Sequence, residues 1–458
     1  MVYKIRWPEI FTYFLTGSLS FIIRFAIWIY PGYGWGRLAI YDVTTYTLYG
    51  REFVKAFLKR DFLKMASIKF GGPPLGIFLI GLSSYAFKSI IDKYKAGLLA
   101  PIALSSLTVL LIHLILRKCF KLSAKYAILG SLIPSFDPYL IQFSAAYLDP
   151  IGAFFVFLAT YIYFRFKDHS VKRYILIGLL MGLSILTKFS FFLFVLFFAM
   201  LLSFMEREHQ AGLVIFLSAI SLTPLIPWIW FGKTLNEKIA RNLAFNSILP
   251  PILFGPIMID IPESYPWYIL TYFGMGQIQW NVLPSTSHFL LFCAIIYRSL
   301  RRDLRINRRM MTFLLASILM MVFMPRNYWT TTWGGGVIKG ENVLLKQFYP
   351  YYFYLTNLVA GLATCDLLFV RSSFSDVKYL TASFSAVVVY CLTAPFTLIM
   401  NGLYPYWDFI FTLIFNFSKG NPIMEHYGLL AFIVTLIMLL ALIIFATLIL
   451  RRTGSLSK

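Results

Sequence analysis

The stretch "SAAYLDPIGAFFVFLATYIYF" (Ser144–Phe164) decides the class of fold, because an Asp-Pro pair opens a long and almost uninterrupted apolar segment. Segments of this kind recur along the 458 residues, of which 59% are hydrophobic and only 13% are charged. Gly428–Leu450 contains no charged residue and is long enough to span a bilayer as a helix. The sequence therefore predicts an all-α, polytopic membrane protein and excludes a water-soluble globular design.

The net charge and the numbers of cysteine and histidine residues indicate which kinds of partner and metal site to expect. A formal net charge of +22 is typical of basic cytoplasmic loops and of attraction to anionic membrane lipid, and nucleic acid is a poor alternative. The N-terminus "MVYKIRWPEIF" precedes a long apolar segment without a small-residue cleavage site, so we expect a retained first helix. Four cysteines and five histidines show neither disulfide nor metal-ligand spacing, so we expect no metal site.

Basic clusters such as Arg117–Lys125 and Arg298–Arg309 locate the cytoplasmic side of the membrane. The same count places Asp42, Lys69 and Asp149 on the non-cytoplasmic face. Spans are expected near residues 9–30, 98–116, 126–143, 150–166, 211–231, 288–300, 310–324, 347–370, 379–400 and 428–450.

Four further segments need separate interpretations. Residues 72–91 are apolar but read as an embedded or interfacial helix within a long first external loop, 31–97. Residues 174–204 are interrupted at Lys188 and predict a pair of helices that meet there. Between residues 44 and 64 apolar and basic residues interleave, as in an amphipathic helix on a bilayer surface. A second external loop, 232–287, is rich in Pro, Trp and Tyr.

Two carboxylates stand out at the outer face. Asp42 lies in "LAIYDVTTYTLYG", where it could cap the following helix or act as a general base on an incoming hydroxyl or amine. Asp149 could likewise be a helix cap, since Pro150 favours a helix start. Either role is compatible with the residues alone.

Three cations lie in or beside apolar segments. Lys69 precedes "FGGPPLG" and could simply snorkel to the interface. Lys188 interrupts an apolar segment, which makes it a functional candidate. Arg24 has the same standing, although it is near enough to the outer end of its span to snorkel. Carboxylates and cations on one membrane face are the groups needed to hold an anionic lipid phosphate while a base activates an acceptor.

The order of motifs resembles the membrane-embedded glycosyltransferases that use polyprenyl-phosphate-linked sugars, whose shared fold is called GT-C. These include protein O-mannosyltransferases and the aminoarabinose transferases that act on lipid A. "YDVTTYTLYG" is similar to their first-loop motif through Asp42 and Tyr46, with Val43 in place of its second acid. "KFGGPPLGIFLIG" is similar to their Pro-Pro-Leu element.

Other motifs extend the resemblance, which covers residues 9–204 well and the remainder loosely. The stretch that ends at Asp149 is similar to the family's second loop, but two alanines stand where the family often has an arginine. "GLLMGLSILTKFSFFLFVL" matches a glycine-rich segment that ends in lysine, here Lys188. "KQFYPYYFYL" is like the family's basic-aromatic-proline motif before a late helix, through Lys346 and Tyr349.

The resemblance implies an organisation and a location. A GT-C transmembrane module would occupy residues 1–204, and a variable C-terminal transmembrane region would occupy 205–458. About 11–13 membrane helices are expected, with interfacial amphipathic helices in the first external loop. The protein would lie in a prokaryotic plasma membrane, with its active site on the non-cytoplasmic side.

The implied reaction is an inverting sugar transfer from a dolichyl or undecaprenyl phosphate to a lipid, protein or glycan. Asp42 would be the base, and Asp149 would orient a cation or the acceptor. No protein-bound cofactor or metal is implied, since the Asp-x-Asp pair of the metal-dependent oligosaccharyltransferases is missing. Lys69, with Arg24 or Lys188, would stabilise the departing phosphate, and the remaining pocket candidates are Tyr46, Lys346 and Tyr349.

Two other functions compete with this one. A transporter or flippase for a lipid-linked sugar would use the same cationic pocket without a base, but no internal repeat is visible. A non-catalytic membrane scaffold would leave Lys188 and the order of the motifs unexplained.

Overall fold

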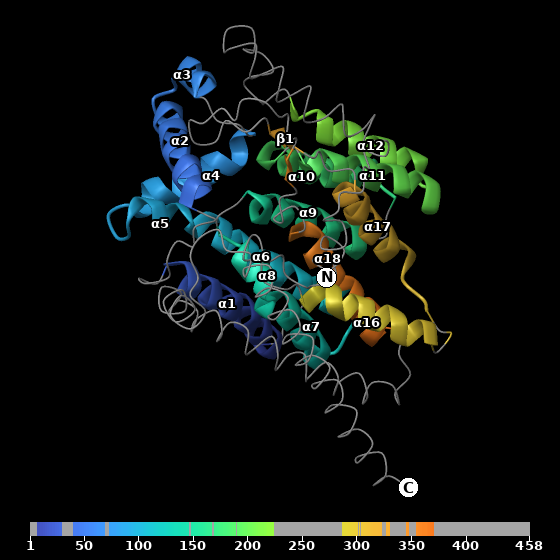
Figure 1. Cartoon of the computed structure of the whole chain (residues 1–458). Helices are drawn as coiled ribbons and strands as arrows, with labels where there is room; N and C mark the ends of the chain where they lie inside the picture. Colours follow the sequence, from blue (N-terminus) through green and yellow to red (C-terminus); the bar gives the residue numbers. More distant parts are fainter. Residues whose placement is uncertain are drawn as a thin grey trace.

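Figure 1 shows the computed structural model of the chain. It describes residues 7–29, 40–68, 73–145, 148–166, 169–188, 190–223, 286–300, 302, 304–322, 327–329, 345–347 and 354–370. The expected spans at 379–400 and 428–450 and most of the loop at 232–287 lie outside these ranges.

Helices account for nearly all of the described residues. The first half of the chain contains α1 (Trp7–Ile29), α2 (Ile40–Leu58), α3 (Phe62–Ser67), α4 (Pro74–Phe87), α5 (Lys93–Gly97), α6 (Leu99–Leu114), a π-helical turn η1 (Ile115–Cys119), α7 (Ala124–Phe136), α8 (Pro138–Gln142), α9 (Asp149–Arg165), α10 (Val171–Thr187), α11 (Ser190–Met205) and α12 (His209–Ile220). The second half contains α16 (Thr286–Leu300), α17 (Arg308–Val322), α18 (Tyr354–Cys365) and a second π-helical turn, η5 (Asp366–Val370).

Three segments that were expected to be interrupted or interfacial helices are helical in the structure. The segment 174–204 forms two helices, α10 and α11, which meet at Lys188. The apolar segment 72–91 forms the 14-residue helix α4, which at 1.5 Å per residue is about 21 Å long, shorter than the ~30 Å hydrocarbon core of a bilayer. The interleaved segment 44–64 is helical in α2 and again at the start of α3.

One expected span is wrong in detail, because residues 126–143 do not form a single helix. α7 ends at Phe136, and the Asp137 carboxylate then accepts hydrogen bonds from the backbone N–H groups of Tyr139 and Leu140, at 3.0 and 3.2 Å. Pro138 is the first residue of α8 and has no N–H, so it cannot continue the hydrogen-bond ladder of α7.

The late span expected at 347–370 also begins differently. Residues 345–347 form the short strand β2 (Leu345–Gln347), which pairs antiparallel with β1 (Asn327–Trp329) and places Lys346 opposite Tyr328. α18 starts at Tyr354, and every residue from Tyr354 to Phe369 is buried.

Helix α9 lies inside the bundle and contacts α6, α10 and α18 (Figure 1). Its Phe157 meets Phe313 of α17 edge to face, with ring centroids 5.6 Å apart, and Phe194 and Phe198 of α11 pack on the same ring. These buried aromatic rings fix α9 against its neighbours. Both ends of α9 are therefore held in place, and both carry charged groups.

Among the described residues, one helical segment meets the length and hydropathy expected of a membrane span. The helical segment Lys93–Cys119 is long and apolar enough to cross a membrane, and shorter apolar helices accompany it within the described ranges. These are Ile10–Phe25, Pro74–Phe87, Ser190–Met205, His209–Ile220 and Tyr354–Val370.

Candidate active site

A buried ion pair joins two of the predicted site residues. The Lys188 Nζ lies 2.9 Å from Oδ1 and 2.7 Å from Oδ2 of Asp149, so the ammonium donates to both carboxylate oxygens. The side chain of Asp149 is 4% exposed and that of Lys188 is 17% exposed. Removing two charges from water is costly and is not repaid reliably by their attraction, so such a pair suggests a functional requirement.

Helix geometry explains why these two residues meet. Asp149 is the first residue of α9, and Lys188 follows the last residue of α10, which runs back along α9. A carboxylate at a helix N-terminus is stabilised by the positive end of the helix dipole. Leu148 occupies the N-cap position of α9, and Asp149 is the first helical residue, whose carboxylate accepts hydrogen bonds from Lys188.

The Pro-Pro-Leu element packs directly beside this pair. Helix α4 begins at Pro74, and a Cβ placed on Gly76 would lie 2.8 Å from Leu148 Cδ2 and 3.0 Å from Thr187 Cγ2. Leu148 immediately precedes Asp149, and Thr187 immediately precedes Lys188. A larger residue at position 76 would have to displace the Leu148 side chain and press on Thr187, so the glycine favours this close approach of α4.

Helix α2, which carries Asp42, is fixed to α4. The two helices cross at Gly50 and Gly81, where a Cβ on Gly81 would overlap the carbonyl group of Gly50. Asp42 and Tyr46 are four residues apart and so share one face of α2. Tyr46 packs on a small apolar cluster that includes Leu148, the residue before Asp149.

Arg24 is buried deeper and has a well-defined set of partners. Its side chain is completely buried, so the alternative of snorkelling to the interface does not apply. Its NH2 donates to the Pro134 carbonyl at 2.8 Å, and its NH1 donates to the Ser135 carbonyl at 3.3 Å. Pro138 has no N–H to offer the carbonyl four residues earlier, so Arg24 satisfies carbonyls released where α7 breaks.

The same arginine connects to the C-terminal half of the chain. Arg24 Nε donates to Ser105 Oγ at 2.9 Å, and that hydroxyl lies 2.7 Å from the hydroxyl of Tyr354. Tyr354 also lies within electrostatic range of Asp149 and Asp137. Arg24, Ser105 and Tyr354 therefore form one buried polar chain that joins α1, α6 and α18.

Sequence reasoning missed Asp137 and Tyr354. The Asp137 carboxylate is fully buried and also accepts hydrogen bonds from the N–H and hydroxyl of Ser287, at 2.9 and 2.6 Å. It thus holds the starts of both α8 and α16. The Asp-Pro pair at 137–138 repeats the pair at 149–150, and this signal could have identified it.

The other predicted site residues are placed only in part. The predictions for Lys69 and Tyr349 lie outside the described residues. For Lys346 and Asp42 the structure gives the position of the backbone, which lies in β2 and in α2, respectively. Across the described segments, no three His, Cys, Asp or Glu side chains gather as a metal site would require.

Comparison with known proteins gives one family and several structures. Residues 72–231 match the family described as dolichyl-phosphate-mannose-protein mannosyltransferase. This match contains the Pro-Pro-Leu element, Asp149 and Lys188. No curated protein sequence matches the chain.

Among solved structures, ArnT from Cupriavidus metallidurans bound to undecaprenyl phosphate is similar with a TM-score of 0.51 and 13% identity, over 97% of this chain and 73% of that one. The apo state of the same protein matches equally well, with a TM-score of 0.51 and 14% identity. The archaeal oligosaccharyltransferase AglB from Archaeoglobus fulgidus has a TM-score of 0.48 and 12% identity, and this chain spans 60% of its length.

At these sequence identities, the solved structures show the fold alone. The family match shows, in addition, a similarity in sequence over residues 72–231. The expected resemblance is confirmed. The chain has the all-α fold of these structures, which is called GT-C, and its residues 72–231 are similar in sequence to a family of mannosyltransferases.

Proposed function

We propose that this chain is a membrane glycosyltransferase that moves a sugar from a polyprenyl phosphate to a lipid, protein or glycan acceptor. The observation that carries the proposal is the buried Asp149–Lys188 pair, with the Pro-Pro-Leu helix packed against both of its neighbours. Tyr46 of α2 packs on the apolar cluster that includes Leu148, and α4 contacts α10, which supports grouping these motifs in one site.

In the proposed reaction a phosphate leaves the sugar, and its negative charge must be stabilised as the bond breaks. Lys188 is the cation that the structure describes at this place, and Asp149 fixes the position of its ammonium. Lys69, four residues before Pro73, would supply a second cation. Arg24 would act indirectly, because its guanidinium holds α1, α6 and α7 together around the site.

Asp42 would take the proton from the acceptor nucleophile as the sugar is transferred. Displacement of phosphate by an acceptor on the opposite face of the sugar would invert the anomeric centre. Tyr46, on the same face of α2 as Asp42, packs on the apolar cluster at the start of α9 and would orient the base. Tyr349 and Lys346 would line the pocket from the C-terminal half of the chain.

Location and orientation belong to the same proposal. The site would face the non-cytoplasmic side of a prokaryotic plasma membrane, because the basic clusters lie at the other ends of α9 and α10. No bound cofactor or metal would be needed, since the phosphate is already a good leaving group once its charge is balanced.

The proposal is tested with the purified chain in lipid nanodiscs and a radiolabelled dolichyl- or undecaprenyl-phosphate sugar. We expect transfer to a mixed lipid and glycan acceptor fraction, and its loss in Asp42→Asn and Lys188→Met. Lys172→Met is the matched control, because Lys172 is an exposed lysine at the opposite end of α10. Wild-type transfer rates in both site variants would refute the proposal.

A further inference from the structure

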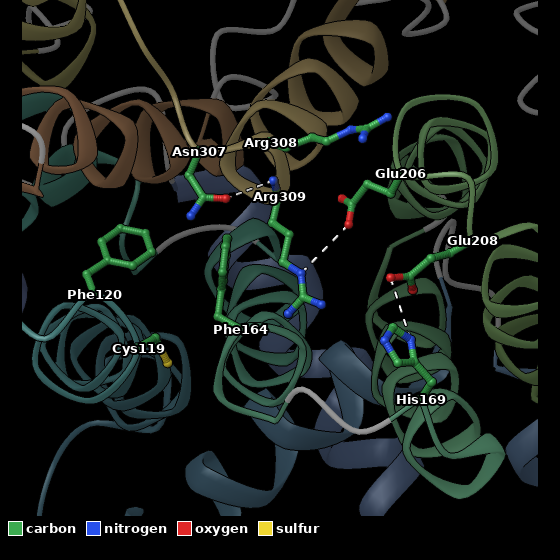
Figure 2. A pocket seen from close by; sticks show the side chains of 9 residues that line it. All are labelled: Cys119, Phe120, Phe164, His169, Glu206, Glu208, Asn307, Arg308 and Arg309. Atoms are coloured by element: carbon green, nitrogen blue, oxygen red, sulfur yellow. Dashed lines mark hydrogen bonds and ion pairs between the residues drawn. The ribbon is translucent and has the colours of Figure 1, made fainter.

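A second charged site lies at the far end of α9 from Asp149 (Figure 2). It is a cavity of about 620 Å³ between η1, the end of α9, the link between α11 and α12, and the start of α17. Phe164, which lines it, follows Asp149 by 15 residues of continuous helix, or about 22 Å at 1.5 Å per residue. The cavity is therefore separate from the candidate active site and lies at the opposite end of the bundle.

Glu206 brings an unused hydrogen-bond acceptor to this cavity. Its side chain is only 6% exposed, and its Oε1 has no hydrogen-bond partner among the described residues. Its Oε2 lies 3.8 Å from Arg309 Nε, a distance that gives an ion pair but no hydrogen bond. Arg309 is also committed elsewhere, because it donates to the Tyr163 carbonyl at 3.1 Å and lies over the Tyr163 ring.

A second unused polar atom lies near this carboxylate. The buried Tyr163 hydroxyl lies close enough to Glu206 to interact with its carboxylate, yet neither this hydroxyl nor Glu206 Oε1 completes a hydrogen bond of ordinary geometry among the described residues. A buried polar atom without a partner costs about 1–3 kcal/mol. The Tyr163 hydroxyl can accept as well as donate, so a bound ammonium group can donate to its oxygen and to Glu206 Oε1.

The neighbouring Glu208 differs from Glu206. Its Oε2 accepts a hydrogen bond from the Tyr174 hydroxyl at 2.9 Å, and its Oε1 lies 3.7 Å from His169 Nδ1. Figure 2 shows this pair on the wall beside Glu206. The two acids of the cavity are therefore not equivalent, and only Glu206 presents an oxygen that lacks a donor within the described structure.

The rim of the cavity supplies the opposite charge and an apolar wall. Arg308 is exposed, lines the cavity, and lies next to Arg309 at the start of α17. Phe120 and Phe164 form the wall across from the acids (Figure 2). The cavity thus offers a buried carboxylate for an ammonium group, a nearby guanidinium for an anion, and aromatic rings for hydrocarbon.

We propose that this cavity binds a phosphoethanolamine headgroup, with its ammonium on Glu206 and Tyr163 and its phosphate on Arg308. Ethanolamine joins an ammonium group to a phosphate through two carbon atoms, so one headgroup presents both charges to a cavity that Glu206 and Arg308 line together. The location at one end of a membrane bundle, beside aromatic rings, favours a membrane lipid as the source of the headgroup. This inference does not depend on the proposed transferase function.

The test is native mass spectrometry of the full chain, released from detergent with defined lipids. Phosphatidylethanolamine should bind about tenfold more tightly than phosphatidylcholine, whose methylated ammonium has no N–H to donate to Glu206. Glu206→Gln should remove this preference, whereas Arg308→Gln should weaken the binding of both lipids by the same factor. Glu52→Gln, an exposed acid on α2, is the matched control and should keep the preference.

A thermal unfolding midpoint of Glu206→Gln equal to wild type in phosphatidylcholine would show that the variant folds. Soluble O-phosphoethanolamine is added in a second arm as competitor. Displacement of the lipid only at much higher concentration supports a lipid source, and displacement at equal concentration overturns it. Equal binding of the two phospholipids by the wild type, or an unchanged preference in Glu206→Gln, overturns the proposed headgroup chemistry.

Discussion

The Asp149–Lys188 pair allows a stability prediction whose size follows from burial. Replacing Lys188 with Met leaves the Asp149 carboxylate, 4% exposed, without its cation. Breaking a buried ion pair by removing one partner costs about 3–5 kcal/mol, because the remaining charge stays out of water. Both side chains are much less than one third exposed, so screening by solvent reduces this energetic cost only slightly.

The double variant Asp149→Asn with Lys188→Met distinguishes the cost of an unpaired buried charge from the cost of losing the side-chain contact. The double variant leaves no buried charge, so we expect its free energy of unfolding to lie within about 1 kcal/mol of the wild-type value. The stability losses of the two single variants should therefore not add. The free energies of unfolding are measured by denaturant titration in bicelles, with intrinsic tryptophan fluorescence as the signal. Lys172→Met and Asp92→Asn serve as controls, since both residues are exposed.

Two results would refute this reasoning. If Lys188→Met costs no more than Lys172→Met, the pair is not buried as described. If the double variant is destabilised by the sum of the two single effects, the residues do not interact. Sugar-transfer activity is measured in parallel, and we expect the stable double variant to be inactive. If the pair served only to stabilise the fold, the stable double variant would remain active.

Other predictions follow from the contacts of single residues. Arg24→Met should destabilise the chain by about 2–6 kcal/mol, because two carbonyls at the α7 break lose a donor at about 1–3 kcal/mol each; an unfolding free energy equal to wild type would contradict this. Gly81→Ala should cost about 1–3 kcal/mol through overlap with Gly50, and hydrogen exchange along α2 should rise. Asp137→Leu removes two helix caps and should cost about 1–4 kcal/mol, and Ser287→Ala should cost less than that, as measured in the same titration.

The sequence was sufficient to predict most of the described helices and the interruption at Lys188, because hydropathy and charge mark apolar helical segments and the breaks between them. The break at Lys188 and the short helix α4 are examples, since an ionisable residue and a Gly-Pro-Pro stretch mark them. The late β1–β2 pair and the interruption of α7 at Asp137 were not predicted. Both depend on hydrogen bonds to partners that an apolar pattern does not encode.

The candidate site was predicted as a set of residues but not as a set of contacts. Asp149 and Lys188 were both identified, yet nothing in the sequence indicated that they bind each other across 39 residues. Arg24 was identified because a charge inside a span is unusual. Its use at the α7 break could not be foreseen, since the free carbonyls result from Pro138, more than 100 positions away.

The most direct test of the central claim is a cryo-electron microscopy map of the chain with a polyprenyl phosphate bound. The account predicts phosphate density about 3 Å from Lys188 Nζ, at the end of α9 that carries Asp149, and its loss in Lys188→Met. Phosphate density at the other end of the bundle, or density that persists unchanged in Lys188→Met, would contradict the account.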